Sequence, residues 1–192
     1  MNTLPDRMPA LRDDQMDDAQ RAAAAELIAG PRKGVKGPFI PLLRSPALMA
    51  RLQKVGEYLR FESALPARLS EFVPLLVARD WSEQFEWFAH VPPALAAGMS
   101  QAVIDQLHAG ARPEGMTAEE ALVYDFVREL TLRRGVSDAT YQRARAAFGE
   151  PGLIDLVATI GYFTLISMVL NVAHTPPGAT PGGVIPLAGF PR

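Results

Sequence analysis

The chain has 192 residues, of which 48% are hydrophobic and 21% charged, with a formal net charge of −2. This composition is typical of one soluble globular domain, and the absence of basic runs beyond Arg32-Lys33 and Arg133-Arg134 argues against a nucleic-acid partner. There is no cysteine, so disulfides, thiolate nucleophiles and thiolate-bound metal centres are excluded.

The first third of the chain predicts two helices and a loop. Residues 1–18 hold five aspartates and no apolar core, so a secretory signal is not expected. Residues 13–29 predict an alanine-rich helix that Gly30-Pro31 ends, and residues 34–41, with two glycines and two prolines, predict an extended loop. Ser45-Pro46 is expected to start a helix that runs to about Phe61. Its apolar residues recur at helical spacing: Leu48, Leu52, Val55 and Leu59.

The middle of the chain predicts three further helices. Pro66 opens the first, in which Pro74 removes a backbone donor and predicts a kink or a late start. Ser82 is expected to cap the second, which runs to about His90 before Pro92-Pro93. Ser100 is expected to cap a short third helix over 101–108, ended by Gly110.

The last third predicts two polar helices, an apolar helix and a tail. Thr117 and Glu120 fit a capping box at the start of a helix to about Arg134, and Ser137 is expected to cap a helix through Phe148. Pro151 opens an apolar helix over 152–173. Its longest apolar run, Leu153 to Leu170, is 18 residues long and contains Asp155, so it favours a buried helix over a membrane span. The tail after Ala173 has five prolines and four glycines and predicts an arm without regular structure.

No segment alternates with period two, so the predicted class is all-α. We expect three parts: an N-terminal helix and Pro/Gly loop (1–39), a helical domain (40–173) and a C-terminal arm (174–192). A cytoplasmic location without membrane contact is the corresponding expectation.

The most informative motif is E-x11-E-x2-E-x3-H, made by Glu71, Glu83, Glu86 and His90. On a helix the last three fall within about 60° of one another, and Trp81, Phe85 and Phe88 fall on the opposite side. Such a polar stripe either faces water, with a Glu86–His90 pair worth a few tenths of a kcal/mol, or lines a site.

This motif resembles that of the carboxymuconolactone decarboxylase family, which shares the AhpD-like helical fold. The phrases Leu69-Ser70-Glu71, Phe85-Glu86-Trp87-Phe88-Ala89-His90 and Ala97-Gly98-Met99-Ser100 carry the resemblance, which covers residues 40–172. It implies an AhpD-like helical bundle that assembles as a homo-oligomer, a trimer or hexamer. The peroxidase branch of that family has cysteines where this chain has Glu83 and Glu86. A carboxylate cannot replace the attacking thiolate, so thiol peroxidase activity is not expected.

The resemblance to the decarboxylase branch implies a lyase that needs no cofactor and acts on a small oxygenated or carboxylated molecule. His90 would deliver or accept the proton, Glu86 would orient it, and Glu71 would act as a second acid or base, with Glu83 as a further candidate. An anionic substrate would need a cation among the arginines of the flanking segments: Arg44, Arg51, Arg60, Arg68 and Arg79.

Two other interpretations stay open at this point. The chain is alternatively a non-catalytic paralogue that binds a ligand or supports assembly, or a metal-dependent enzyme that uses the Glu/Glu/His cluster. Tyr162, in the apolar helix, is either a core tyrosine or a substrate contact, and Trp87 either packs in the core or forms a wall of the pocket. No metal and no cofactor are predicted in the leading interpretation.

Overall fold

Eight α-helices and one 3₁₀ turn make up the regular structure of residues 5–188, the part of the chain that this computed structural model describes. The all-α class expected from the sequence is therefore confirmed. In chain order the elements are η1 (Asp13–Gln15), α1 (Asp18–Ala29), α2 (Phe39–Leu42), α3 (Pro46–Phe61), α4 (Ala67–Trp81), α5 (Gln84–Ala96), α6 (Gln101–His108), α7 (Ala118–Arg133) and α8 (Asp138–Ala173).

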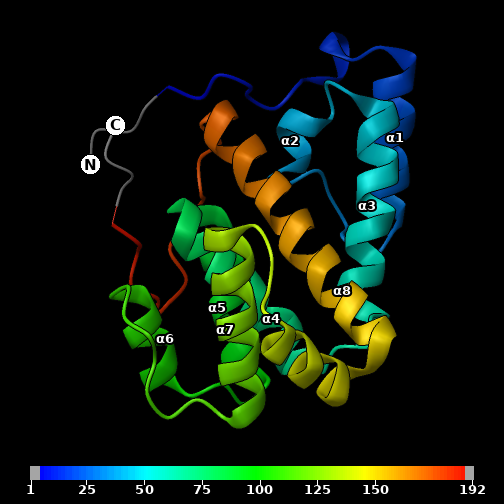
Figure 1. Cartoon of the computed structure of the whole chain (residues 1–192). Helices are drawn as coiled ribbons and strands as arrows, with labels where there is room; N and C mark the ends of the chain where they lie inside the picture. The colour runs from blue at the N-terminus through cyan, green and yellow to red at the C-terminus, as the bar shows by residue number, and fades with distance from the viewer. Residues whose placement is uncertain (1–4, 189–192) are drawn as a thin grey trace.

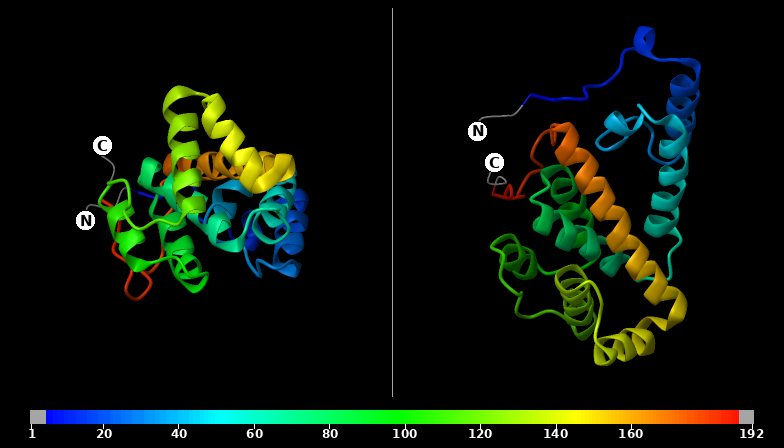
Figure 2. Two further views of the ribbon diagram at one scale, coloured as in Figure 1. Left: turned by 60° about the horizontal axis from the view of Figure 1, so that its bottom comes forward. Right: turned by 45° about the horizontal axis from the view of Figure 1, so that its top comes forward.

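Helix α8 crosses the middle of the molecule, with α1–α3 to one side and α4–α7 to the other (Figure 1; Figure 2). It packs against α4, α7, α2 and α3, and α4 also packs against α5. Helix α4 is deeply buried, because nine of the ten residues from Leu69 to Ala78, all except Glu71, are shielded from solvent. A candidate site between α3, α4, α5 and α8 is thus held by a well-packed part of the fold.

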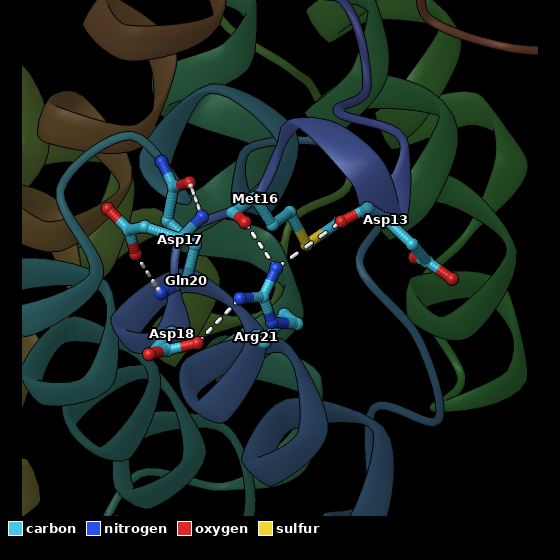
Figure 3. A network of polar contacts seen from close by, with 6 residues as sticks. All are labelled: Asp13, Met16, Asp17, Asp18, Gln20 and Arg21. Atoms are coloured by element: carbon cyan, nitrogen blue, oxygen red, sulfur yellow. Dashed lines mark hydrogen bonds and ion pairs between the residues drawn. The ribbon is translucent and has the colours of Figure 1, made fainter.

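The start of α1 is fixed by polar contacts with the turn before it (Figure 3). Asp17 is the N-cap, and its carboxylate accepts the Gln20 N–H at 2.7 Å, which satisfies a donor that the helix leaves unpaired. Arg21 folds back over this turn and donates to the Met16 carbonyl and to Asp18. The single helix expected over 13–29 is therefore a 3₁₀ turn followed by a shorter helix.

The connection between α4 and α5 differs from the expectation that Ser82 caps α5. Ser82 has left-handed backbone angles, φ 48° and ψ 38°, and ends α4. The N-cap of α5 is Glu83, whose carboxylate accepts the Glu86 N–H at 2.7 Å. The reason is that only two residues join the helices, so Ser82 is used in closing the first and Glu83 must start the second.

Helix α5 does not end at His90, as the two prolines after it suggested. It continues through Pro92 and Pro93 to Ala96, with Val91 and Ala94 fully buried. Burial of these apolar side chains offsets the lost backbone hydrogen bonds. Helix α4 likewise continues through the buried Pro74. His90 consequently lies in the middle of a helix, where its backbone is held firmly.

Helix α8 consists of two segments, as expected, because Gly149 interrupts it with φ 67° and ψ 178°. By length and composition alone it is the one helix within residues 5–188 that could cross a membrane. Half of its most apolar window is buried inside the protein, against α4 and its neighbours. This burial favours the interpretation of α8 as a core helix.

The segment after α8 has no regular structure up to residue 188 and lies along α5 and α6. Gln84 exchanges two hydrogen bonds with the backbone of Leu187, and the Pro186 carbonyl contacts His108. Val184 and Leu187 are buried. The tail therefore covers the side of α5 that carries Gln84 and Trp87.

Candidate functional site

The two outer residues of the motif meet because α4 and α5 form a tightly connected hairpin. Helix α4 carries Glu71 and α5 carries Glu86 and His90. The Nδ1 atom of His90 lies 2.5 Å from Glu71 Oε2, and its Nε2 atom lies 3.2 Å from Glu86 Oε2. The structure thus forms a chain of three groups, Glu71–His90–Glu86, in which the imidazole is central.

The environment of His90 favours its protonated form. Burial by itself lowers the pKa of His90, but the hydrogen bonds and charges of Glu71 and Glu86 outweigh it and raise the pKa above its ordinary value of 6.5. An imidazolium donates from both nitrogens, which is what two flanking carboxylates require. The Phe163 ring meets the imidazole edge-on at 4.9 Å and fixes its plane. The two carboxylates therefore stabilise a protonated His90, the state from which a general acid donates.

The Glu86 end of this hydrogen-bonded series lies at a cavity of about 180 Å³. Glu86 and His90 form its acid–base wall, while Glu71 lies behind His90 and does not line it. Four rings form the apolar walls: Phe39, Phe85, Tyr162 and Phe163. Phe85 was expected on the opposite face of α5, but it precedes Glu86 in the first turn of the helix and also lines the cavity.

Of the five arginines proposed as anion anchors, only Arg60 lines this cavity. Its Nε atom lies 3.8 Å from Glu71 Oε1, so it balances the charge of that carboxylate. The other four have partners elsewhere: Arg44 with the carbonyls of Ile40 and Pro9, Arg51 with the Ala47 carbonyl, Arg68 with Glu119 and Glu120, and Arg79 with the His108 carbonyl.

Arg32, which the motif does not include, forms part of the cavity wall. Its guanidinium lies 4.5 Å above the Phe39 ring, and its buried Nε has no hydrogen-bond partner. It belongs to the loop between α1 and α2, outside the region of the family resemblance. The only signal for it in the sequence was a basic pair within a stretch rich in glycine and proline.

Tyr162 presents a neutral hydroxyl to the cavity. Burial, together with the nearby Glu86 charge and despite the opposing charges of Arg32 and Arg60, raises its pKa to about 12. The phenol therefore keeps its proton at any physiological pH and can donate a hydrogen bond to a ligand. This placement agrees with the interpretation of Tyr162 as a substrate contact.

Two candidate residues do not lie at the cavity. Trp87 is fully buried, and its indole N–H donates to the Ile185 carbonyl at 3.0 Å, so the tail occupies the place where a substrate was expected. Glu83 is used as the cap of α5 and is not among the lining residues. Burial raises the pKa of its carboxyl to about 7, an effect that the Glu86 N–H partly offsets.

The geometry does not favour the metal-dependent interpretation. Within residues 5–188, no three His, Asp or Glu side chains are arranged to hold a metal ion. Both ring nitrogens of His90 contact carboxylates, Nδ1 with Glu71 and Nε2 with Glu86. The carboxylate of Asp155, a further buried acidic group, already accepts hydrogen bonds from the Tyr58 hydroxyl and the Ala64 N–H.

Comparison with known proteins identifies no relative: no family model, no curated protein and no solved structure matches the chain.

Proposed function

We propose that the chain is a cofactor-independent lyase of the decarboxylase type that acts on a small oxygenated or carboxylated molecule. The observation that supports this proposal best is the buried Glu71–His90–Glu86 chain, which meets an aromatic cavity at its Glu86 end. The resemblance of residues 40–172 to the carboxymuconolactone decarboxylase family, with an AhpD-like bundle, stays a prediction, because no family model matches the chain.

The distances suggest a different role for each group. The short contact to Glu71 holds the imidazole in place and stabilises its positive charge, which makes Glu71 a positioning residue. The longer Nε2 contact to Glu86 leaves that N–H more easily taken over by a substrate. His90 then donates its Nε2 proton as the general acid, and Glu86 contacts the bound substrate beside it.

The reaction requires one proton and no external oxidant. The C–C bond to a carboxylate breaks, its electron pair passes into a conjugated carbonyl system, and the carboxylate leaves as CO₂. The enolate-like charge that develops is stabilised by the nearby imidazolium, which then donates one proton to carbon. The aromatic side chains that line the cavity give this step a partly apolar environment.

The test is turnover of a set of small unsaturated lactone acids and 3-oxo acids in deuterated water. Wild-type protein is expected to release CO₂ and to place one deuterium on the product carbon. His90→Gln is expected to lower kcat by about 10²–10⁴-fold, the usual contribution of a general acid. His108→Gln is the matched control, because His108 contacts the tail and not the cavity.

Folding is checked by the melting temperature of each variant. Unchanged turnover in a folded His90→Gln protein would rule out the proposed mechanism. Ligand binding without any turnover by the wild type would favour the non-catalytic paralogue instead.

A further inference from the structure

Two cations that line the cavity, Arg32 and Lys36, have no ion-pair partner within residues 5–188, and of these Lys36 is exposed to solvent while Arg32 is partly buried. Arg60 is occupied by Glu71, whereas Arg32 forms no ion pair with any residue of the 5–188 range. Its Nε is buried without a hydrogen-bond partner. A buried guanidinium donor left unpaired is costly, and a carboxylate is the group that satisfies its planar fork best.

The size of the cavity limits what such a carboxylate can be attached to. An apolar cavity of about 150 Å³ holds one benzene molecule. The volume here, about 180 Å³, fits one ring or a conjugated chain of that size with a carboxylate at one end. The aromatic rings of Phe39, Phe85 and Phe163, which line the cavity, suit an unsaturated body.

Gly56 creates the space in which the anchor lies. A Cβ atom at this position would come within 2.2 Å of the Tyr162 hydroxyl oxygen and 2.8 Å of Arg32 Nη2. The hydroxyl and the guanidinium therefore both reach the same point on α3 only because residue 56 has no side chain. Two hydrogen-bond donors from different segments converge there, at the cavity wall.

We infer that Arg32, assisted by the Tyr162 hydroxyl, binds a carboxylate of the ligand, and that this carboxylate is the one the reaction leaves in place. The inference rests on the proposed function for the second statement only. An ion pair stabilises the charged carboxylate in the ground state, so loss of CO₂ from that group would be slowed. The departing carboxylate must be a different one, and the product keeps its anion on Arg32.

The experiment measures equilibrium binding of benzoate and of benzamide, its neutral counterpart, by isothermal titration calorimetry. Wild-type protein is expected to prefer benzoate by at least about tenfold. Arg32→Met should weaken benzoate binding by about 10- to 100-fold and remove the preference, as for other charge-assisted hydrogen bonds. Arg32→Lys should retain part of it. Arg51→Met, which removes an exposed arginine of α3, is the matched control.

Gly56→Ala provides an independent variant, because the added methyl displaces Arg32 and Tyr162 together. It should weaken benzoate more than benzamide. Equal binding of the two probes by the wild type, no binding of either, or a preference that survives in Arg32→Met would each overturn the inference. An Arg32-dependent preference without turnover of any acid would leave carboxylate binding by Arg32 standing, while the proposed function and the statement on the retained carboxylate would fall. Turnover without an Arg32-dependent preference would overturn the inference and leave the proposed function standing.

Discussion

At the scale of single residues, Glu83 shows why a helical wheel misplaced part of the site. The wheel assumed that Glu83, Glu86 and His90 share helical backbone angles. Glu83 instead has φ −92° and ψ 109°, and its carboxylate turns back to the Glu86 N–H. The wheel held for Glu86 and His90, which are one helical turn apart and do meet.

The buried carboxyl of Glu83 leads to a prediction on stability. Its pKa rises from 4.5 to about 7 on burial, so between these pH values the folded chain binds more protons than the unfolded chain. Stability therefore falls as pH rises from 4.5 to 7, by an amount on the order of 3 kcal/mol. Glu83→Gln keeps an acceptor for the cap and removes the charge. The variant is expected to be more stable than wild type at pH 8 and similar at pH 4.

Urea unfolding followed by circular dichroism at both pH values measures this difference. Glu150→Gln, at an exposed position, is the control and should leave the profile unchanged. A Glu83→Gln protein that is less stable than wild type at pH 8 would show that the ionised cap is favourable in place.

At the scale of elements, most helix boundaries were predicted, and the errors are the starts of α1 and α5, the end of α5 and the short α2, which was expected to be loop. Start signals are local: the Thr117 and Ser100 caps form as their side chains suggest. The continuation of α5 through Pro92-Pro93 depends on tertiary burial of its neighbours, which no local pattern contains. Helix α3 gives a second case. Leu48 and Val55 of its apolar stripe are about half exposed, while Gln53 and Gly56 are buried against other segments.

The break in α8 gives the prediction at this scale. Gly149 has backbone angles that are favourable only for glycine, and a Cβ there would meet nothing closer than Pro151 Cδ at 3.7 Å. Gly149→Ala should therefore lose about 1–3 kcal/mol through backbone strain alone. Gly161→Ala, on an open helical face of the same element, should gain about 0.5–1 kcal/mol.

Thermal unfolding of both variants provides the comparison. Unchanged stability of Gly149→Ala would mean that the two segments of α8 do not need the observed turn. A destabilised Gly161→Ala would mean that its face is covered in solution.

At the scale of the whole molecule, the site combines segments that are distant in sequence. The loop before α2 contributes Arg32, α3 contributes Gly56 and Arg60, α5 contributes Glu86 and His90, and α8 contributes Tyr162 and Phe163. The acid–base part was predictable because one helix hairpin carries it with a regular spacing. Arg32 was not, because its position depends on how a glycine- and proline-rich loop packs over α3 and α5. The homo-oligomer, a trimer or hexamer, stays a prediction.

The protonation state of His90 tests the central claim most directly. Titration of the His90 ring by ¹⁵N NMR should give a pKa above 6.5, because Glu71 and Glu86 each accept one hydrogen bond from the protonated ring. Glu71→Gln should lower that pKa. A midpoint at or below 6.5 that does not respond to Glu71→Gln would contradict the assignment of His90 as an acid whose protonated form is stabilised by two carboxylates.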